Sequence, residues 1–385
     1  MNKLALALAV LIALPATAAA QDAGGALPKI DAPEPAAGGE AAPAAEADEA
    51  FAAFQRGYYL TAFGLATPRA AAGDAAAQTL LAEIYSNGYG VPRDYEKAAS
   101  WYGLAAASGN VQAQFALALM KLEGRGTSRD PAGAADLFEK AAAGGHTPAA
   151  YNLGLIYVEG KARPADYARA ARLFTEAAEA NNIEAQYALG TLYAEGAGVA
   201  KDEARAAEWI GKAAVGGLIA AEVEYGILLF KGRGLPKDEK AAAAWFEKAA
   251  KAGNPIAQNR LARLYANGLG VPLDPVEAGK WHLVARSQGL SDAWLDGFLA
   301  TMSEEDRANA AARAQAWPGE PGTAPAGGFS GSAGMSGMDG MSGSADGAAK
   351  DAAPATGETK DAAAPAGDAP AADGPAAETP AKDKP

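Results

Sequence analysis

The chain has 385 residues, a net charge of −13, two histidines and no cysteine. The lack of cysteine excludes a disulfide framework, a thiolate metal site, a cysteine nucleophile and a lipid-modified cysteine as an anchor. The excess of acidic residues lies in two flanks, 21–50 and 318–385, and the near-neutral array between them offers no basic stripe for nucleic acid.

The N-terminal residues have the pattern of a secretory signal peptide, which we place at 1–20. Lys3 provides the positive start, residues 4–14 form a short apolar core, and Ala20 ends a small-residue cleavage site. This core is well short of the roughly 20 apolar residues that span a bilayer. We therefore expect a periplasmic or secreted protein, cleaved near Ala20, with no membrane anchor of its own. The next segment, 21–49, is an Ala/Pro/acidic linker that we expect to be disordered, because it has few large apolar residues to bury.

Residues 50–76 are predicted to form a degenerate helix pair at the start of the folded part. Phe51, Phe54, Tyr58 and Phe63 supply an apolar face for it.

Residues 77–290 contain a sequence pattern that recurs every 36 residues, six times in register. Each unit opens with an alanine: Ala77, Ala113, Ala149, Ala185, Ala221 and Ala257. A glycine follows eleven residues later: Gly88, Gly124, Gly160, Gly196, Gly232 and Gly268. An aspartate follows seventeen residues after the alanine: Asp94, Asp130, Asp166, Asp202, Asp238 and Asp274. A period of this length predicts stacked helix pairs, in which each pair buries its apolar face against its neighbours.

The fourth unit shows how the pattern is divided between two helices. Ala185, Leu189 and Tyr193 share one face of a first helix. Gly196 then begins a turn, and Asp202 is placed to cap the second helix by accepting a backbone N–H.

The second helices are predicted to pack through small residues on either side of one large residue. We expect that large residue to fill the gap to the next pair: Trp101, Leu137, Leu173, Trp209, Trp245 and Trp281. A glycine ends most of these helices, with Asn181 in its place in the third unit, and Asn110, Asn182 and Asn254 can cap the helices that follow.

The repeating unit resembles the Sel-one-like repeat, a branch of the tetratricopeptide superfamily. The resemblance rests on the order of alanine, leucine-glycine, tyrosine, paired glycines, aspartate, alanine, tryptophan, double alanine and glycine. The resemblance covers roughly residues 50–302. The tyrosine is replaced by Lys121 and Leu229 in two units, and Ala162 with Arg163 replaces the turn residues of the third unit, whose turn we expect to be reshaped. The resemblance implies an all-α, right-handed α-solenoid of helix-turn-helix repeats and a role in protein–protein interaction without shared chemistry.

In that superfamily the first helices line a concave groove. Alignment on the tyrosines places the groove-facing residues two, six and nine positions after each opening alanine. These positions are polar or small in the end units, as at Glu83 and Arg263, and apolar in the middle. The candidate partner-binding residues are Phe115, Leu119, Leu122, Tyr151, Leu155, Val158, Tyr187, Val223, Ile227 and Phe230. The alternative interpretation is that neighbouring helices cover most of this strip.

Enzyme signatures are absent from the sequence, so we predict no catalytic residues and no cofactor. His146 and His282 lie too far apart for metal-ligand spacing, and His282 occupies a position that is aromatic in other units. The six aspartates are expected to cap helices, and the glycine pairs lack the lysine of a phosphate-binding loop.

Residues 291–317 are predicted to form capping helices. Ala293 occupies the opening position of a further unit, but Trp294 and Phe298 depart from the pattern. Ser303 can cap a last helix that ends near Trp317.

The C-terminal segment, 318–385, is an Ala/Pro/Gly/Asp-rich tail that we expect to be disordered. Met335, Met338 and Met341 are spaced three residues apart within it. Thioethers suit copper(I), but no histidine or cysteine accompanies them, so this is a weak candidate metal site based on ligand type alone.

These observations predict a non-catalytic, exported scaffold of the bacterial envelope that binds a partner protein, either an envelope or a membrane protein, in the groove. The alternative is a module that binds peptidoglycan or another cell-wall ligand. The oligomeric state is left open by the sequence.

Overall fold

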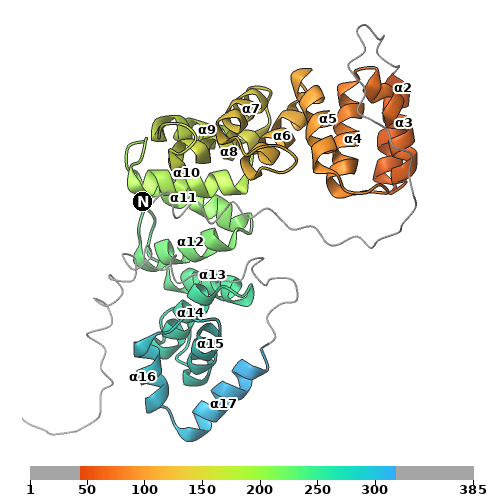
Figure 1. Cartoon of the computed structure of the whole chain (residues 1–385). Coiled ribbons are helices and arrows are strands. Elements are labelled where there is room, and N and C mark those ends of the chain that lie inside the picture. Colours follow the sequence, from red (N-terminus) through yellow and green to blue (C-terminus); the bar gives the residue numbers. More distant parts are fainter. Residues whose placement is uncertain (1–43, 318–385) are drawn as a thin grey trace, which may run out of the picture. The chain divides into compact units, whose positions relative to one another are not determined.

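The computed structural model describes residues 44–317, and this range contains sixteen α-helices and no β-strand (Figure 1). The first helices of the pairs are α2 (Ala44–Gln55), α4 (Ala75–Asn87), α6 (Val111–Glu123), α8 (Thr147–Glu159), α10 (Ile183–Glu195), α12 (Ile219–Lys231) and α14 (Pro255–Asn267). The second helices are α3 (Tyr59–Ala71), α5 (Tyr95–Ala107), α7 (Pro131–Ala143), α9 (Tyr167–Glu179), α11 (Glu203–Val215), α13 (Glu239–Lys251) and α15 (Pro275–Ser287). The all-α repeat architecture is confirmed. The signal peptide at 1–20 and the tail with its three methionines lie outside the described residues.

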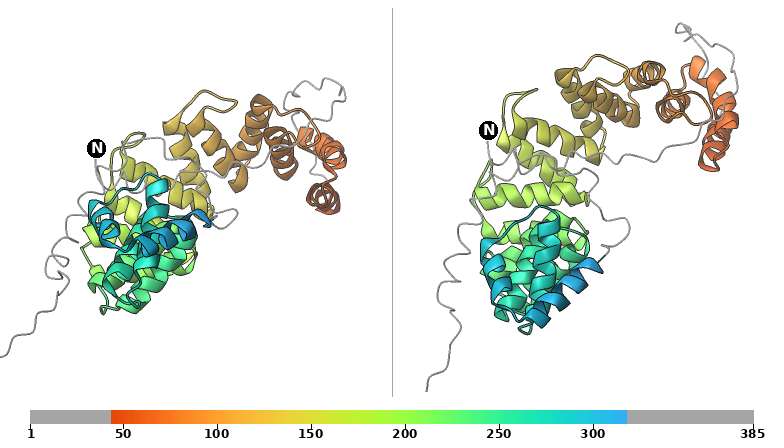
Figure 2. Two further views of the ribbon diagram at one scale, coloured as in Figure 1. Left: turned by 90° about the horizontal axis from the view of Figure 1, so that it is seen from below. Right: turned by 60° about the horizontal axis from the view of Figure 1, so that its bottom comes forward.

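From α2 to α15, each helix packs mainly against the helices that precede and follow it in the chain, so the pairs stack in sequence order (Figure 2). The buried residues form four clusters that succeed one another along the array. Leu137 packs against two of these clusters, and Tyr225 and Trp245 pack against another two. Stability therefore comes from contacts between neighbouring pairs, as expected for a solenoid.

The predicted helix caps are present. Each of the six aspartates accepts a backbone N–H at the start of a second helix, as Asp94 does from Lys97 at 3.0 Å. That backbone N–H holds the pKa of Asp94 below its usual value. Asn110, Asn182 and Asn254 cap first helices in the same way. Asn181 is the only described non-glycine residue with a positive φ, of 64°.

Inside each pair, the residue after the predicted gap-filling residue is the more deeply buried one. Phe138, Phe174 and Phe246 are fully buried, whereas Leu137 and Trp245 remain half-buried. A small residue on the first helix makes room for each ring: a Cβ atom on Gly154 would lie 2.5 Å from Cε1 of Phe174. Leu137 and Trp245 each pack against two buried clusters, as expected of residues that fill the gap to the next pair, whereas the residue after each of them fills the space within the pair.

The reshaped turn of the third unit is also confirmed, and its cause is steric. The second glycine of the other turns has a positive φ, of 65° at Gly126 and 72° at Gly198. A Cβ atom on Gly126 would lie 1.9 Å from the carbonyl oxygen of Tyr95 in the preceding pair. Ala162 carries such an atom and has no positive φ, because the standard turn would bring it into this clash.

A buried glutamine near the start of most first helices ties neighbouring pairs together. Gln114 and Gln186 donate from Nε2 to the carbonyl oxygens of Ala106 and Ala178, each at 3.2 Å. In α12 the equivalent residue is Glu222, which is 2 % exposed. Its carboxylate pairs with Nζ of Lys248 at 2.6 Å, so the pattern is broken without leaving a buried charge unpaired.

The C-terminal end is closed by α16 (Ala293–Thr301) and α17 (Glu304–Gln315). The last helix packs against α15, where the next first helix of the array would lie (Figure 1). Gly279 permits this contact, since a Cβ atom there would lie 2.8 Å from Cβ of Ala310. Trp317 packs edge-on against Trp281, with ring centroids 4.9 Å apart.

The first helix α8 is capped by a histidine at a position where three other units have asparagine. Nδ1 of His146 accepts the backbone N–H of Ala149 at 3.3 Å, and Nε2 lies 3.1 Å from Oε1 of Gln112. An accepting Nδ1 requires the neutral imidazole with its proton on Nε2. Burial lowers the pKa of His146, in agreement with this protonation state.

Gly154→Ala should lower the stability of the array by about 1–3 kcal/mol, because the added methyl group overlaps the ring of Phe174. Gly64→Ala is the control: this exposed glycine of α3 has open space around it, so alanine should stabilise the helix by up to about 1 kcal/mol. Thermal and urea unfolding followed by circular dichroism measure both changes. Equal stability of Gly154→Ala and the wild type would contradict the close-packing argument.

His146→Asn should reduce the loss of stability on acidification. The pKa of His146 is lower in the folded chain than its usual value of about 6.5 in the unfolded chain. As the pH falls through about 6.5, the unfolded chain therefore binds a proton first, and the free energy of unfolding decreases. Asparagine keeps the cap and has no such titration. The melting temperatures of the two proteins, followed from about pH 8 to about pH 5, should diverge as the pH falls. Parallel curves would show that His146 is not the titrating group.

Candidate partner-binding surface

The candidate surface consists of the solvent-facing residues of the first helices α4 to α14, which we call the first-helix surface. Six of the ten predicted residues are half-buried on it: Phe115, Leu119, Leu122, Tyr187, Ile227 and Phe230. The other four are buried: Tyr151, Leu155, Val158 and Val223, with exposed fractions of 6, 5, 2 and 7 %. None of these ten residues is fully exposed, and the function of the strip as a binding surface stays a prediction.

Burial is concentrated on α8, in the middle of the array. Tyr151 packs against Phe174 with ring centroids 5.8 Å apart, and Leu155 and Val158 belong to the largest buried cluster. Phe115 and Leu119 of α6 pack against the same cluster. For α8, the alternative interpretation that neighbouring helices cover the strip therefore describes the structure, and the accessible apolar side chains lie on α6 and α12.

The structure adds a position that the sequence alignment did not select, three residues after each opening alanine. Asn152, Glu224 and Arg260 occupy it and are half-buried on α8, α12 and α14. Burial raises the pKa of Glu224, against the opposing effects of nearby Arg233, Lys231 and Arg260. The signal in the sequence is that these three residues are polar or charged, whereas the other units have leucine or alanine at this position.

At the C-terminal end, two predicted groove positions are used within the fold. Arg263 makes a bidentate ion pair with Asp292, with distances of 2.8 and 2.9 Å, and Nδ2 of Asn259 donates to the same carboxylate at 2.8 Å. Although burial acts to raise it, these hydrogen bonds hold the pKa of Asp292 below its usual value. At the other end, Glu83 accepts the hydroxyl proton of Tyr102 at 2.7 Å.

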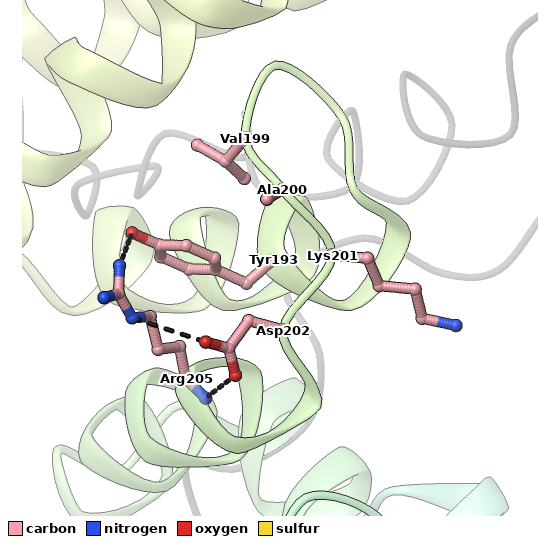
Figure 3. Close-up of a pocket in the computed structure, with 6 residues that line it drawn as sticks. All are labelled: Tyr193, Val199, Ala200, Lys201, Asp202 and Arg205. Carbon is pink, nitrogen blue, oxygen red and sulfur yellow. Dashed lines mark hydrogen bonds and ion pairs between the residues drawn. The ribbon is translucent and has the colours of Figure 1, made fainter. Parts of the chain in front are cut away.

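An open pocket of about 360 Å³ lies beside the turn of the fourth unit and is lined by Tyr193, Val199, Ala200, Lys201, Asp202 and Arg205 (Figure 3). Its polar groups bind one another: Arg205 donates to the hydroxyl of Tyr193 at 3.2 Å and pairs with Asp202 at 3.4 Å. Asp202 also caps α11. The guanidinium of Arg205 also lies over the ring of Tyr193, 5.5 Å from its centroid, and this cation-π contact recurs as Lys97 on Tyr85 and Arg169 on Tyr157. The polar groups of Tyr193, Asp202 and Arg205 in this pocket are therefore engaged within the fold.

The histidines are engaged in the fold. His282 is 1 % exposed, and its Nε2 lies 2.8 Å from Oδ1 of Asp296. Among residues 44–317, no three histidine, cysteine or acidic side chains are grouped so that they could hold a metal ion. The weak candidates Met335, Met338 and Met341 lie outside this range.

No helix in the described part of the chain is both long enough and apolar enough to span a bilayer.

A search of curated proteins finds no match to this sequence. Among solved structures, a Sel1 repeat protein from Oxalobacter formigenes is 30 % identical with a TM-score of 0.57, and the match covers 65 % of this chain and 100 % of that one. A second is c5321, a protective antigen present in uropathogenic Escherichia coli strains that displays an SLR fold. It is 26 % identical with a TM-score of 0.51, and the match covers 82 % of this chain and 73 % of that one.

The Sel1 repeat profile matches six consecutive segments: 75–110, 111–146, 147–182, 183–217, 219–254 and 255–290. Together these segments make up more than half of the chain, and they coincide with the helix pairs α4–α5 to α14–α15. The protein therefore belongs to the Sel1 repeat family, whose fold is typically a non-catalytic scaffold and whose members generally act in protein–protein interaction.

Proposed function

We propose that this protein is an exported, non-catalytic scaffold of the bacterial envelope that holds a partner protein against its first-helix surface. The observation that carries the proposal is the accessible apolar area on α6 and α12. Leu119 and Ile227 occupy the same repeat position as Leu155, which is 5 % exposed, yet both remain half-buried. Apolar side chains that retain solvent contact on a rigid helix are suitable anchors for a partner.

The proposed location rests on the sequence at 1–20, where a positive start, a short apolar core and small residues before Gln21 resemble a cleavable export signal. Export would bring the first-helix surface to envelope proteins and to the outer parts of membrane proteins. Release of the mature protein and sequencing of its N-terminus would test this step separately from partner binding.

The binding surface can be tested by in-cell crosslinking of the tagged full-length protein, followed by mass spectrometry of the captured proteins. Leu119→Ser combined with Ile227→Ser should reduce capture of the main partner by about tenfold or more, because two apolar anchors are lost. Leu155 is not suitable for this test: it is buried, so a polar substitution there would act by unfolding the repeat.

The matched control is Leu104→Ser combined with Val215→Ser. These residues are 37 and 74 % exposed and lie on the second helices α5 and α11, so the control also removes two apolar side chains from solvent-accessible positions. Capture should be unchanged in the control. If the Leu119/Ile227 variant is folded and captures the same partner as the wild type, the first-helix surface is not the binding site. Capture of cell-wall fragments alone would instead support the ligand-binding alternative.

A further inference from the structure

Arg260 is a charged side chain for which the described part of the chain provides no binding partner. It lies on α14, where it is half-buried, and it makes no hydrogen bond or ion pair with residues 44–317. A guanidinium has five N–H donors in a planar arrangement suited to carboxylates. A half-buried arginine without an acceptor is therefore a group prepared for an external anion.

One candidate acceptor, Asp292, acts on Arg260 electrostatically but is already occupied. Its two oxygens accept two N–H groups of Arg263 and the side-chain amide of Asn259. They also accept the backbone N–H groups of Trp294 and Leu295, at 3.0 and 3.2 Å. Five donors exceed the roughly four lone-pair positions of a carboxylate, so Asp292 cannot also bind Arg260.

The charges around Arg260 favour an additional carboxylate. After burial, the charge of Arg263 is the main cause that lowers the pKa of Arg260, and Arg260 in turn lowers the pKa of Lys231. The carboxylates of Asp292 and Glu224 oppose this effect on Arg260, and Glu224 forms no ion pair with Arg260 or Lys231. A ligand carboxylate would relieve the repulsion between these cations.

An accessible aromatic surface lies beside the same arginine pair. Trp294 is 37 % exposed, its ring stacks on Phe298 with centroids 5.9 Å apart, and the guanidinium of Arg263 lies 5.3 Å from its centre. Arg263 thus lies next to both Arg260 and Trp294. The arrangement offers a carboxylate site with an apolar contact next to it.

We propose that Arg260 anchors an acidic peptide segment of the partner protein at the C-terminal end of the first-helix surface, with an apolar side chain of that segment placed against Trp294. This proposal rests on the proposed function and specifies the chemistry of its partner. A nucleic acid is a poorer fit, because a polyanion needs an extended basic surface and the array as a whole is not basic.

The test uses the full chain and fluorescence anisotropy with labelled short peptides in which glutamate stands beside phenylalanine. Peptides with glutamine in place of glutamate show whether the carboxylate is required. Peptides with an amidated or a free C-terminus distinguish a side-chain carboxylate from a terminal one. Arg260→Gln should weaken binding of the glutamate peptide by about tenfold or more, and Arg260→Lys by less, because the bidentate geometry is lost but the charge is kept.

Two further variants separate a direct effect from misfolding. Glu224→Gln should tighten binding, because it removes the competing carboxylate, and a misfolded site would not gain affinity. Arg172→Gln, on the exposed face of α9, makes the same change of charge as Arg260→Gln and should leave affinity unchanged. Unfolding curves of all four variants confirm that the array is intact.

Equal affinity of wild type and Arg260→Gln, or equal binding of the glutamate and glutamine peptides, would overturn the proposal. A gain of peptide affinity on deleting residues 318–385 would also overturn it, since the acidic tail of the chain itself would then be the occupant. If crosslinking captures a partner and this capture requires Leu119 and Ile227 but not Arg260, the present inference fails while the proposed function stands.

Discussion

The structure depends on the close approach of the two helices within each pair. Gly154, Gly190 and Gly226 have no Cβ atom, and the space is taken by Phe174, Ile210 and Phe246 of the second helix. This contact lets an alanine-rich sequence bury large side chains, which supply most of the hydrophobic free energy of each repeat. Because the helix ends are fixed by caps of the same kind in every unit, the surface positions of successive first helices are also kept in register.

Local features could be predicted from the sequence because they depend on one residue and its backbone. The aspartate and asparagine caps, the left-handed Asn181 and the altered turn at Ala162 are of this kind. The rotation of the second helix could not be predicted in the same way. Two large residues stand side by side in it, and only the glycine opposite Phe174 indicates which of the two faces the first helix.

The candidate surface was harder to predict because burial is a property of the neighbours. Leu119 and Leu155 occupy the same repeat position, yet only Leu155 is buried, since α8 lies in the largest core cluster. His146 shows a second kind of limit. Asn110, Asn182 and Asn254 at the equivalent positions indicate a cap, but histidine is not among the residues preferred at helix N-caps, so the residue type alone does not predict its role.

Polar residues of a repeat protein can be divided by whether the fold uses them. Recurring residues such as Asp202 cap a helix by accepting a backbone N–H, here that of Arg205. If such a residue bound a ligand instead, the helix would lose this N-terminal hydrogen bond. Those that break the pattern are free to serve recognition unless another side chain satisfies them. Glu222 and Glu224 show the distinction on one helix: Glu222 is paired with Lys248, whereas Glu224 has no ion pair and borders Arg260. Because the family fold is typically a non-catalytic scaffold, the specificity of this protein should depend on such unmatched residues, and Glu224 and Arg260 place two of them toward the C-terminal end of its first-helix surface.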